Sequence, residues 1–443
     1  MKIVFVGAGS TVFVKNLVGD LFVTEGVPAD LEIALYDIDP VRSEESRLVA
    51  EALTTNFNQG RASVKTFVGV ENRSAALEGA AIVIFTVQVG GYKPATVSDF
   101  EIPKKYGIRQ TIGDTLGIGG IFRGLRTIPV IDAMIEEMHH VAPNAILLNY
   151  TNPMAIVTGA ALDRWPGRTV GLCHSVQVCA PHLLRDLGME AHDLRWSIAG
   201  INHMAWLLEI RDGKRDLYPE IKRRAAEKNR AALSGDADRH PDMVRYEIMK
   251  HFGYYTTESS EHAAEYTPYW IKNSAPERIE RFNIPLDEYP RRCEEQISAW
   301  EEQRVALADT GQIAHDRSVE YAADIVAAYA TDLPSRIHGN VRNDGSIPNL
   351  PQDAVVEVPV MVDGNGLHRV PVEPLPPQCA ALNRTNINVQ LLTISAAREL
   401  RRERVYQAAM LDPVTSSELP PEEIISMCDE LFEAHRAYLP EYR

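Results

Sequence analysis

The chain has 443 residues, 45 % of them hydrophobic and 24 % charged, and its formal net charge is −16. This length accommodates two domains with substantial cores. The acidic balance argues against binding to nucleic acid or to an anionic membrane surface, because both need a basic face.

Five cysteines, an odd number without regular spacing, argue against a disulfide framework. The N-terminal stretch "MKIVFVGAGS" has too short an apolar segment for a signal peptide, and no apolar run approaches the roughly 20 residues that cross a bilayer. We therefore expect a protein of the reducing cytoplasm.

Residues 2–6 are an apolar run that predicts a central parallel strand, and a helical apolar pattern begins at Val12. A glycine turn between a strand and a helix is typical of a nucleotide pyrophosphate site, because small residues let the backbone approach and the helix N-terminus faces the anion. Val12 replaces the third glycine of the usual fingerprint. The candidate cofactor-binding residues of this turn are Gly7, Gly9, Ser10 and Thr11.

The next predicted strand, 32–36, ends at Asp37. An acidic residue at the tip of the second strand hydrogen-bonds the adenosine ribose and repels a 2′-phosphate, so the sequence predicts NAD rather than NADP. Asp39, two residues further on, is an alternative for the same role.

Further strands are predicted at 81–87, 145–149 and 169–172, so residues 1–195 form a Rossmann-like, doubly wound parallel sheet. From about residue 193 longer amphipathic helices are expected, and residues 196–443 form an α+β domain for substrate and oligomerisation. Residues 355–370 predict a strand pair joined at "DGNG" by a hairpin turn rather than a calcium loop, because the ligand spacing of such a loop is missing.

Cys173 and His203 each follow a short apolar run that predicts a buried strand. A thiol and an imidazole placed at two strand ends can converge on one divalent metal ion of the first transition row. Asn152 precedes a proline, which holds it extended, and its amide there can orient a ligand hydroxyl. An ordinary buried cysteine, a loop histidine and a plain turn are the alternatives.

The motifs "NYTNPM", "VGLCHS" and "GINHM", together with "GAGST" at the N-terminus, resemble glycoside hydrolase family 4. The segments "TESSEHAAEYTPYW", "NVRNDG", "LPQDAVVEVP" and "TNINVQ" resemble its alpha-galactosidase (melibiase) branch. One departure is Val178, where that branch usually has glycine.

This resemblance implies an NAD- and metal-dependent glycosidase that departs from the common mechanism with two carboxylates. NAD+ takes a hydride from C3 of the sugar, a base removes the C2 proton, and a divalent metal acts as Lewis acid. The aglycone then leaves C1 with help from an acid, water adds, and the hydride returns.

The resemblance also implies roles for single residues. Cys173 and His203 are expected to hold the metal, Mn2+ or another divalent ion. His174 is expected to be the acid, and Asn152 to bind the sugar. The base is left open among three residues, with Glu258 first, then Tyr266 and Glu261.

Within the family, an alpha-galacturonidase or alpha-glucuronidase is the alternative, and its substrate carboxylate would require an arginine in the pocket. Sequence leaves open which of Arg123, Arg126 and Arg342 points inward. The resemblance implies a homodimer or homotetramer. Outside the family, a lactate- or malate-type dehydrogenase and a non-catalytic NAD-binding sensor are more remote. "GINHMAW" lacks the Asp of the "GxHGD"-like turn of such dehydrogenases.

Overall fold

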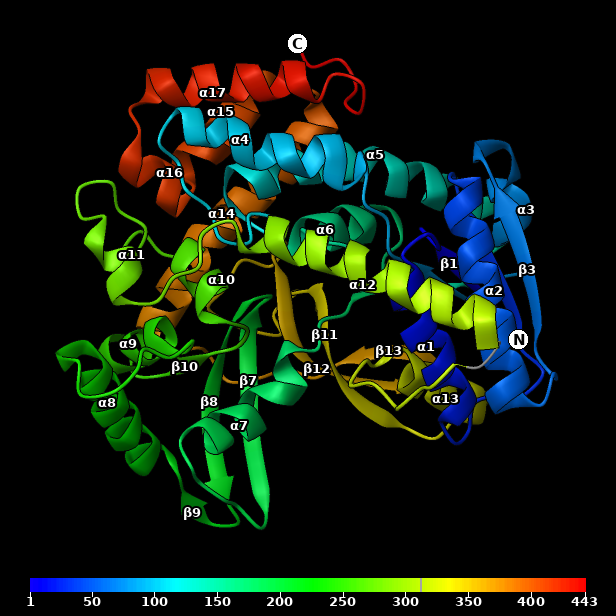
Figure 1. Ribbon diagram of the computed structural model, residues 1–443, viewed down its shortest axis with the longest axis horizontal. Coiled ribbons are helices and arrows are strands. Elements are labelled where there is room, and N and C mark those ends of the chain that lie inside the picture. The colour runs from blue at the N-terminus through cyan, green and yellow to red at the C-terminus, as the bar shows by residue number, and fades with distance from the viewer. Residues whose placement is uncertain (311–312) are drawn as a thin grey trace.

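The computed structural model describes residues 1–310 and 313–443, and the side chains outside 301–312 (Figure 1). One 13-stranded sheet runs through the molecule. Its parallel part has the strand order β3-β2-β1-β4-β5-β6, which is the order of doubly wound dinucleotide-binding folds. The bounds are β1 Lys2–Val6, β2 Glu32–Asp37, β3 Ser63–Val68, β4 Ile82–Phe85, β5 Ile146–Asn149 and β6 Thr169–Gly171. The expected parallel sheet is confirmed.

The remaining strands continue the same sheet from β6 as antiparallel neighbours, in the order β11-β12-β7-β8-β10, with β9 and β13 attached to β8 and β12. Their bounds are β7 Leu194–Ile201, β8 Met204–Asp212, β9 Arg215–Asp216, β10 Tyr255–Thr256, β11 Ser335–Arg342, β12 Val355–Asp363 and β13 Gly366–Arg369. The expected hairpin at "DGNG" joins β12 to β13.

The expectation of helices from about residue 193 was wrong for its first twenty residues, which form the β7–β8 hairpin. The chain division near residue 195 stays a prediction, because that residue lies inside β7 and one sheet passes through both halves.

Helices cover both faces of the parallel part, and most of the others lie around its antiparallel extension (Figure 1). Their bounds are α1 Thr11–Val23, α2 Pro40–Asn58, α3 Arg73–Leu77, α4 Val97–Lys105, α5 Gly117–Val141, α6 Met154–Arg164, α7 Ser175–Asp186, α8 Tyr218–Ser234, α9 Met243–Phe252, α10 Ser260–Glu265, α11 Glu277–Arg281, α12 Glu288–Thr310, α13 Ala322–Thr331, α14 Pro377–Glu399, α15 Arg402–Leu411, α16 Pro413–Glu418 and α17 Pro421–Ala434, with short turns η1 Val70–Asn72 and η2 Gly91–Thr96. No helix of the described chain is long and apolar enough to cross a membrane.

Strand β1 shows why the central strands are apolar on both sides. Ile3 and Phe5 belong to the core that α1 and α2 cover, whereas Val4 and Val6 belong to a second core with α3 and the end of α5. Alternate side chains of a strand point to opposite faces, so a strand between two helical layers must be apolar throughout.

A buried ion pair fixes the turn that follows β4. Arg126 of α5 donates two hydrogen bonds to Asp99 of α4, at 3.0 and 2.5 Å, and a third to the carbonyl oxygen of Val89 at 3.0 Å. Both charged side chains are nearly inaccessible to water, so each needs the other. The pair thereby holds the residue 89–92 turn against the carboxyl ends of the parallel strands.

Candidate active site

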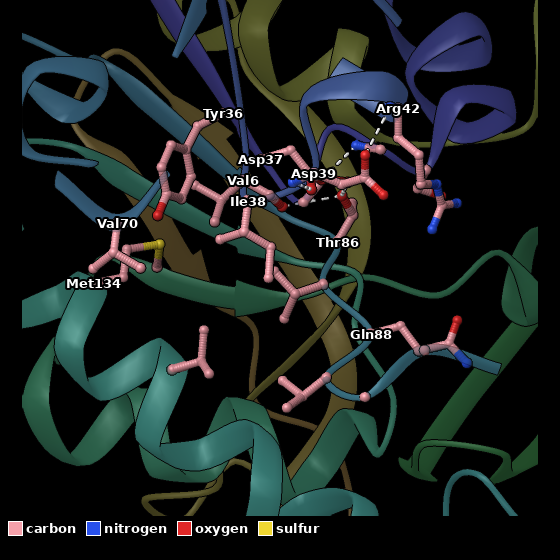
Figure 2. Close-up of a pocket in the computed structure, with 18 of the residues that line it drawn as sticks. Val6, Tyr36, Asp37, Ile38, Asp39, Arg42, Val70, Thr86, Gln88 and Met134 are labelled. Atoms are coloured by element: carbon pink, nitrogen blue, oxygen red, sulfur yellow. Dashed lines mark hydrogen bonds between the residues drawn. The ribbon is translucent and has the colours of Figure 1, made fainter. Parts of the chain in front are cut away.

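A cavity of about 580 Å³ opens at the carboxyl ends of β1, β2 and β4 (Figure 2). Its wall includes the glycine turn after β1, the tip of β2 and the turn after β4. Four residues that were expected to bind the cofactor lie in this wall, namely Gly7, Gly9, Ser10 and Asp37, and so does the alternative Asp39. Arg42, Gln88 and Gly90, which were not predicted, also line the cavity. The pocket therefore lies where a doubly wound sheet binds a dinucleotide.

The glycine turn is packed against its neighbours too closely for a side chain. Gly7 has φ +85°, and a Cβ at Gly9 would lie 2.8 Å from Asp37 Oδ2. The Gly9 N–H donates to that same oxygen at 2.6 Å. Asp39 accepts hydrogen bonds from the first turn of α2, at Val41 and Arg42, so it caps a helix. The geometry favours Asp37 as the carboxylate at the ribose.

Thr11 and Val12 differ in where their side chains lie. The Thr11 hydroxyl accepts a hydrogen bond from Ser46 of α2 at 3.0 Å and is buried between the two helices. Val12, which takes the place of the third glycine, is 37 % exposed on the outer side of α1. A side chain at that position is therefore compatible with the turn.

Cys173, His203 and Glu258 converge on one point near the centre of the sheet. Their Sγ, Nε2 and Oε2 atoms all lie within 4.8 Å of one another, and Glu258 Oε2 is 3.6 Å from each of the other two. Cys173 follows β6, His203 lies in the two-residue turn between β7 and β8, and Glu258 lies between β10 and α10. The donors are a soft sulfur, an imidazole and a carboxylate, a set that suits a first-row divalent metal.

Two of these residues have a backbone conformation that side-chain-bearing residues rarely adopt: φ is 64° at His203 and 63° at Glu258. Arg245 of α9 donates a hydrogen bond to the carbonyl oxygen of Glu258. Arg245 is in turn paired with Asp242 at 2.5 Å and lies over the Tyr255 ring, 4.5 Å from its centroid. This network holds the Glu258 carboxylate toward the other two donors.

Burial and charge set the protonation of the three donors. Burial lowers the pKa of His203, which keeps the imidazole neutral, and raises the pKa of the Cys173 thiol well above its ordinary value. For Glu258, burial acts to raise the pKa, but the histidines 203, 262 and 174 outweigh it and bring the pKa to about 2. A cation binding here therefore meets a carboxylate and a neutral imidazole, and displaces the proton of the thiol.

His174, next to Cys173, begins α7 and is exposed. Its Nδ1 lies 3.1 Å from Glu320 Oε1. The hydrogen bond to Glu320, which outweighs the effect of burial, raises the pKa of His174 above its ordinary value. A protonated imidazole beside the three donors fits the expected role of an acid.

The candidates for the base lie in different surroundings. Among the residues that the structure describes, the buried Tyr266 hydroxyl has no hydrogen-bond partner, and burial, with Asp114 and further charges nearby, raises its pKa well above the ordinary value. Glu261 instead pairs with Arg292 of α12, with 3.3 Å between the charged atoms. Val178 lies partly exposed in α7.

Asn152 is held on both sides. Its side-chain Nδ2 donates to Asp114 at 3.0 Å, and its backbone carbonyl oxygen accepts from Arg123 Nε at 3.0 Å. Asp114, a buried carboxylate in the glycine-rich loop before α5, was not predicted from the sequence. Its only signal was an acidic residue among glycines. The loop is held by Glu265 of α10, which accepts from the backbone N–H groups of Thr111 and Gly113.

The three arginines considered for a uronide substrate separate clearly. Arg126 is bound to Asp99 inside the molecule, and Arg342 pairs with Asp163 near the surface. Arg123 alone is both buried and next to Asn152.

Two family models together match most of the chain: "Family 4 glycosyl hydrolase" matches residues 2–189, and "Family 4 glycosyl hydrolase C-terminal domain" matches residues 198–415. The chain is 54 % identical over 442 residues to an alpha-galactosidase of Bacillus subtilis strain 168, covering 100 % of both proteins. The chain belongs to family 4 of the glycosyl hydrolases. The resemblance seen in the sequence is confirmed.

Further similarity agrees with this family 4 assignment. An alpha-galactosidase of Rhizobium meliloti strain 1021 is 34 % identical, with 100 % of this chain and 89 % of that protein covered. A 6-phospho-alpha-glucosidase from gut microorganisms, solved in complex with NAD and Mn2+, has the same fold, with a TM-score of 0.80 at 22 % identity, covering 100 % of this chain and 99 % of that one. Family membership sets aside the lactate- or malate-type dehydrogenase and the non-catalytic sensor.

Removing one donor of the cluster should weaken metal binding while leaving the fold intact. We expect Cys173→Ser and Glu258→Gln each to raise the Mn2+ dissociation constant by at least about 10-fold, since loss even of groups behind a ligand costs about 10- to 100-fold. Free Mn2+ measured by electron paramagnetic resonance during titration gives the constant. Glu261→Gln, a nearby carboxylate outside the cluster, is the matched control. Unchanged affinity in Glu258→Gln would remove Glu258 from the site.

The buried Glu265 should make stability depend on pH. Burial raises its pKa to about 7 from an ordinary 4.5. Because the folded value is the higher one, its contribution to stability is fully present below pH 4.5 and is lost as the pH rises through 7. Between pH 5 and pH 9 we expect wild type to lose on the order of 3 kcal/mol more unfolding free energy than Glu265→Gln. Urea denaturation at both pH values measures this, and equal losses would contradict it.

Proposed function

We propose that this family 4 enzyme is an alpha-galactosidase that uses NAD+ and a divalent metal, preferably Mn2+. The observation that carries the proposal is that Cys173, His203 and Glu258 meet within 4.8 Å of one another. Cys173 directly follows β6, which is parallel to the strands whose carboxyl ends line the dinucleotide cavity. Two relatives that match along the whole chain are alpha-galactosidases. The solved relative described above was crystallised with NAD and Mn2+.

The residues present fit both cofactors. The glycine turn leaves a cradle in which a Cβ at Gly9 would meet Asp37, and the donor set at Cys173 suits a soft or borderline divalent ion. When bound, NAD+ accepts and returns a hydride at C3 of the sugar, and the metal supplies Lewis-acid stabilisation of the negative charge that develops beside C2.

His174 acts as the acid at C1. Glu320 accepts a hydrogen bond from the Nδ1 side of its ring, which raises the pKa of His174 and thereby favours the protonated ring, with its other N–H directed away from Glu320. The exposure of His174 lets water reach the same end of the sugar after the aglycone has left.

Tyr266 acts as the base at C2. Of the three residues considered, Glu258 has its carboxylate among the cluster donors and serves best as the third ligand, while Glu261 is paired with Arg292. The Tyr266 hydroxyl is buried and has no hydrogen-bond partner, so it is available to a substrate. Positive charge at the cluster favours the phenolate, opposing the effect of burial on the pKa.

Asn152 and Asp114 bind sugar hydroxyls, with the carboxylate accepting and the amide donating. A galactoside fits better than a uronide, because Arg126 and Arg342 are already paired with carboxylates, and Arg123 donates to the Tyr289 hydroxyl and the Asn152 backbone carbonyl. Asp114 would also repel a substrate carboxylate nearby. We further propose that the enzyme works in the cytoplasm, in keeping with five cysteines that are all unpaired. We also propose that it is a homodimer or homotetramer.

Elimination at C2 is tested by hydrogen exchange. During turnover of an aryl alpha-galactoside in D2O, we expect deuterium at C2 of the released galactose, because the C2 proton must leave. Tyr266→Phe should reduce that exchange by about 10²-fold or more if the hydroxyl is the general base. It should also keep the wild-type affinity for Mn2+. Mass spectrometry or NMR of the product measures the label.

The outcomes of this experiment separate the parts of the proposal. Full retention of hydrogen at C2 in the wild type would contradict elimination. Wild-type exchange in Tyr266→Phe would take the role of base away from Tyr266. Tyr254→Phe is the matched control: the Tyr254 ring packs edge-on against Tyr218, with 6.0 Å between the ring centroids, so this variant should exchange as wild type does.

A further inference from the structure

Helix α12 connects the sugar end of the site with the dinucleotide end. Figure 1 shows it crossing in front of α1 and reaching α2. Its first turn pairs through Arg292 with Glu261 of α10, and Trp300 donates to Glu45 of α2 at 3.0 Å. Between these ends, Glu294 accepts from Tyr92 at 2.9 Å.

The dinucleotide end of α12 forms one wall of a second cavity, of about 380 Å³. The opposite wall is the N-terminus of α1 and the turn before it. This cavity shares four lining residues with the dinucleotide cavity, namely Gly9, Ser10, Arg42 and Gln88. A pyrophosphate at the glycine turn would therefore lie on the boundary between the two cavities, facing α12.

The sugar end of α12 is connected to Asn152 through two hydrogen bonds. Arg123 Nη1 donates to the Tyr289 hydroxyl at 3.0 Å, and Arg123 Nε donates to the carbonyl oxygen of Asn152 at 3.0 Å. The guanidinium also lies 5.3 Å from the centroid of the Tyr289 ring. Arg123 is 7 % exposed, so water competes little for these bonds.

Rigid geometry makes this connection sensitive to the position of α12. The guanidinium is a planar fork, so its two bonds fix the Tyr289 hydroxyl relative to the Asn152 backbone. Tyr289 and Trp300 lie on one helix, roughly 16 Å apart at 1.5 Å per residue. A shift of α12 would therefore move the Asn152 backbone and weaken sugar binding.

We propose that Tyr289 and Arg123 are positioning residues through which α12, once held by an occupied dinucleotide site, sets Asn152 for the sugar. The inference rests on the proposed function, because it takes the two ligands to be a dinucleotide and a galactoside. It adds that the adenosine and pyrophosphate part of the dinucleotide strengthens sugar binding without touching the sugar. By linkage, the sugar strengthens dinucleotide binding by the same factor.

ADP-ribose tests this coupling because it lacks the nicotinamide that would contact the sugar directly. Galactose binding to the Mn2+-loaded enzyme is measured by calorimetry with and without saturating ADP-ribose. In the wild type we expect ADP-ribose to lower the galactose dissociation constant about 5-fold or more, the lower end of typical couplings. In Tyr289→Phe, which keeps the ring but loses the hydroxyl, the ratio should fall below about twofold.

Two further variants separate positioning from general destabilisation. Trp300→Phe, at the far end of α12, should also reduce the coupling, whereas Tyr106→Phe, whose hydroxyl bonds Glu430 elsewhere, should keep it. With an aryl alpha-galactoside at saturating NAD+, Tyr289→Phe should raise KM several-fold and leave kcat within about twofold. A residue with a merely structural role would instead lower the melting temperature and leave the ADP-ribose effect intact.

Each remaining outcome decides a separate question. Wild-type enzyme that hydrolyses an alpha-galactoside but shows no ADP-ribose effect on galactose binding overturns the coupling alone. Full coupling in Tyr289→Phe overturns the assigned route. Wild-type enzyme that binds neither ADP-ribose nor galactose contradicts the proposed function, and the coupling falls with it.

Discussion

The convergence of Cys173, His203 and Glu258 is the constraint on which the rest of the site depends. The three side chains come from the end of the last parallel strand, from the turn of the first antiparallel hairpin and from the segment before α10. They meet only because one sheet continues from its parallel part into its antiparallel part. Burial keeps the His203 imidazole neutral and the pKa of Glu258 is about 2, so the cluster offers a cation an uncharged ring nitrogen and an ionised carboxylate.

The same sheet carries both the dinucleotide cavity and the three donors, with Cys173 after the last of the parallel strands. The parallel strands provide the glycine turn and Asp37, which already binds the Gly9 N–H. The antiparallel hairpin provides His203 in a turn with φ 64°, and Arg245 holds Glu258 from behind. Chemistry that oxidises C3 and deprotonates C2 needs a dinucleotide and a cation at one sugar, and one sheet carries the residues for both.

Local patterns in the sequence predicted the parts of the molecule that are local in space. The parallel strands other than β3, the glycine turn, Asp37 and the hairpin at "DGNG" each lie within a few consecutive residues, and the structure has them where they were expected; β3, Ser63–Val68, was not predicted. The strand before His203 was predicted, but its partner β8 was missed, because longer helices were expected from about residue 193. The resemblance to family 4 gave Glu258 a role but not its place among the donors. Asp114 and Tyr289 were missed, and Arg123 was left open among three arginines, because the contacts of these residues join positions 38 and 166 residues apart.

The central claim is that the enzyme needs both a dinucleotide and a divalent metal, held at adjoining sites. The most direct measurement is the hydrolysis of an aryl alpha-galactoside by protein that has been stripped of metal with a chelator and of nucleotide by gel filtration after partial unfolding and refolding. The account predicts negligible activity from the stripped protein, negligible activity after adding NAD+ or Mn2+ alone, and recovery when both are added under reducing conditions. Full hydrolysis by the stripped protein would contradict it.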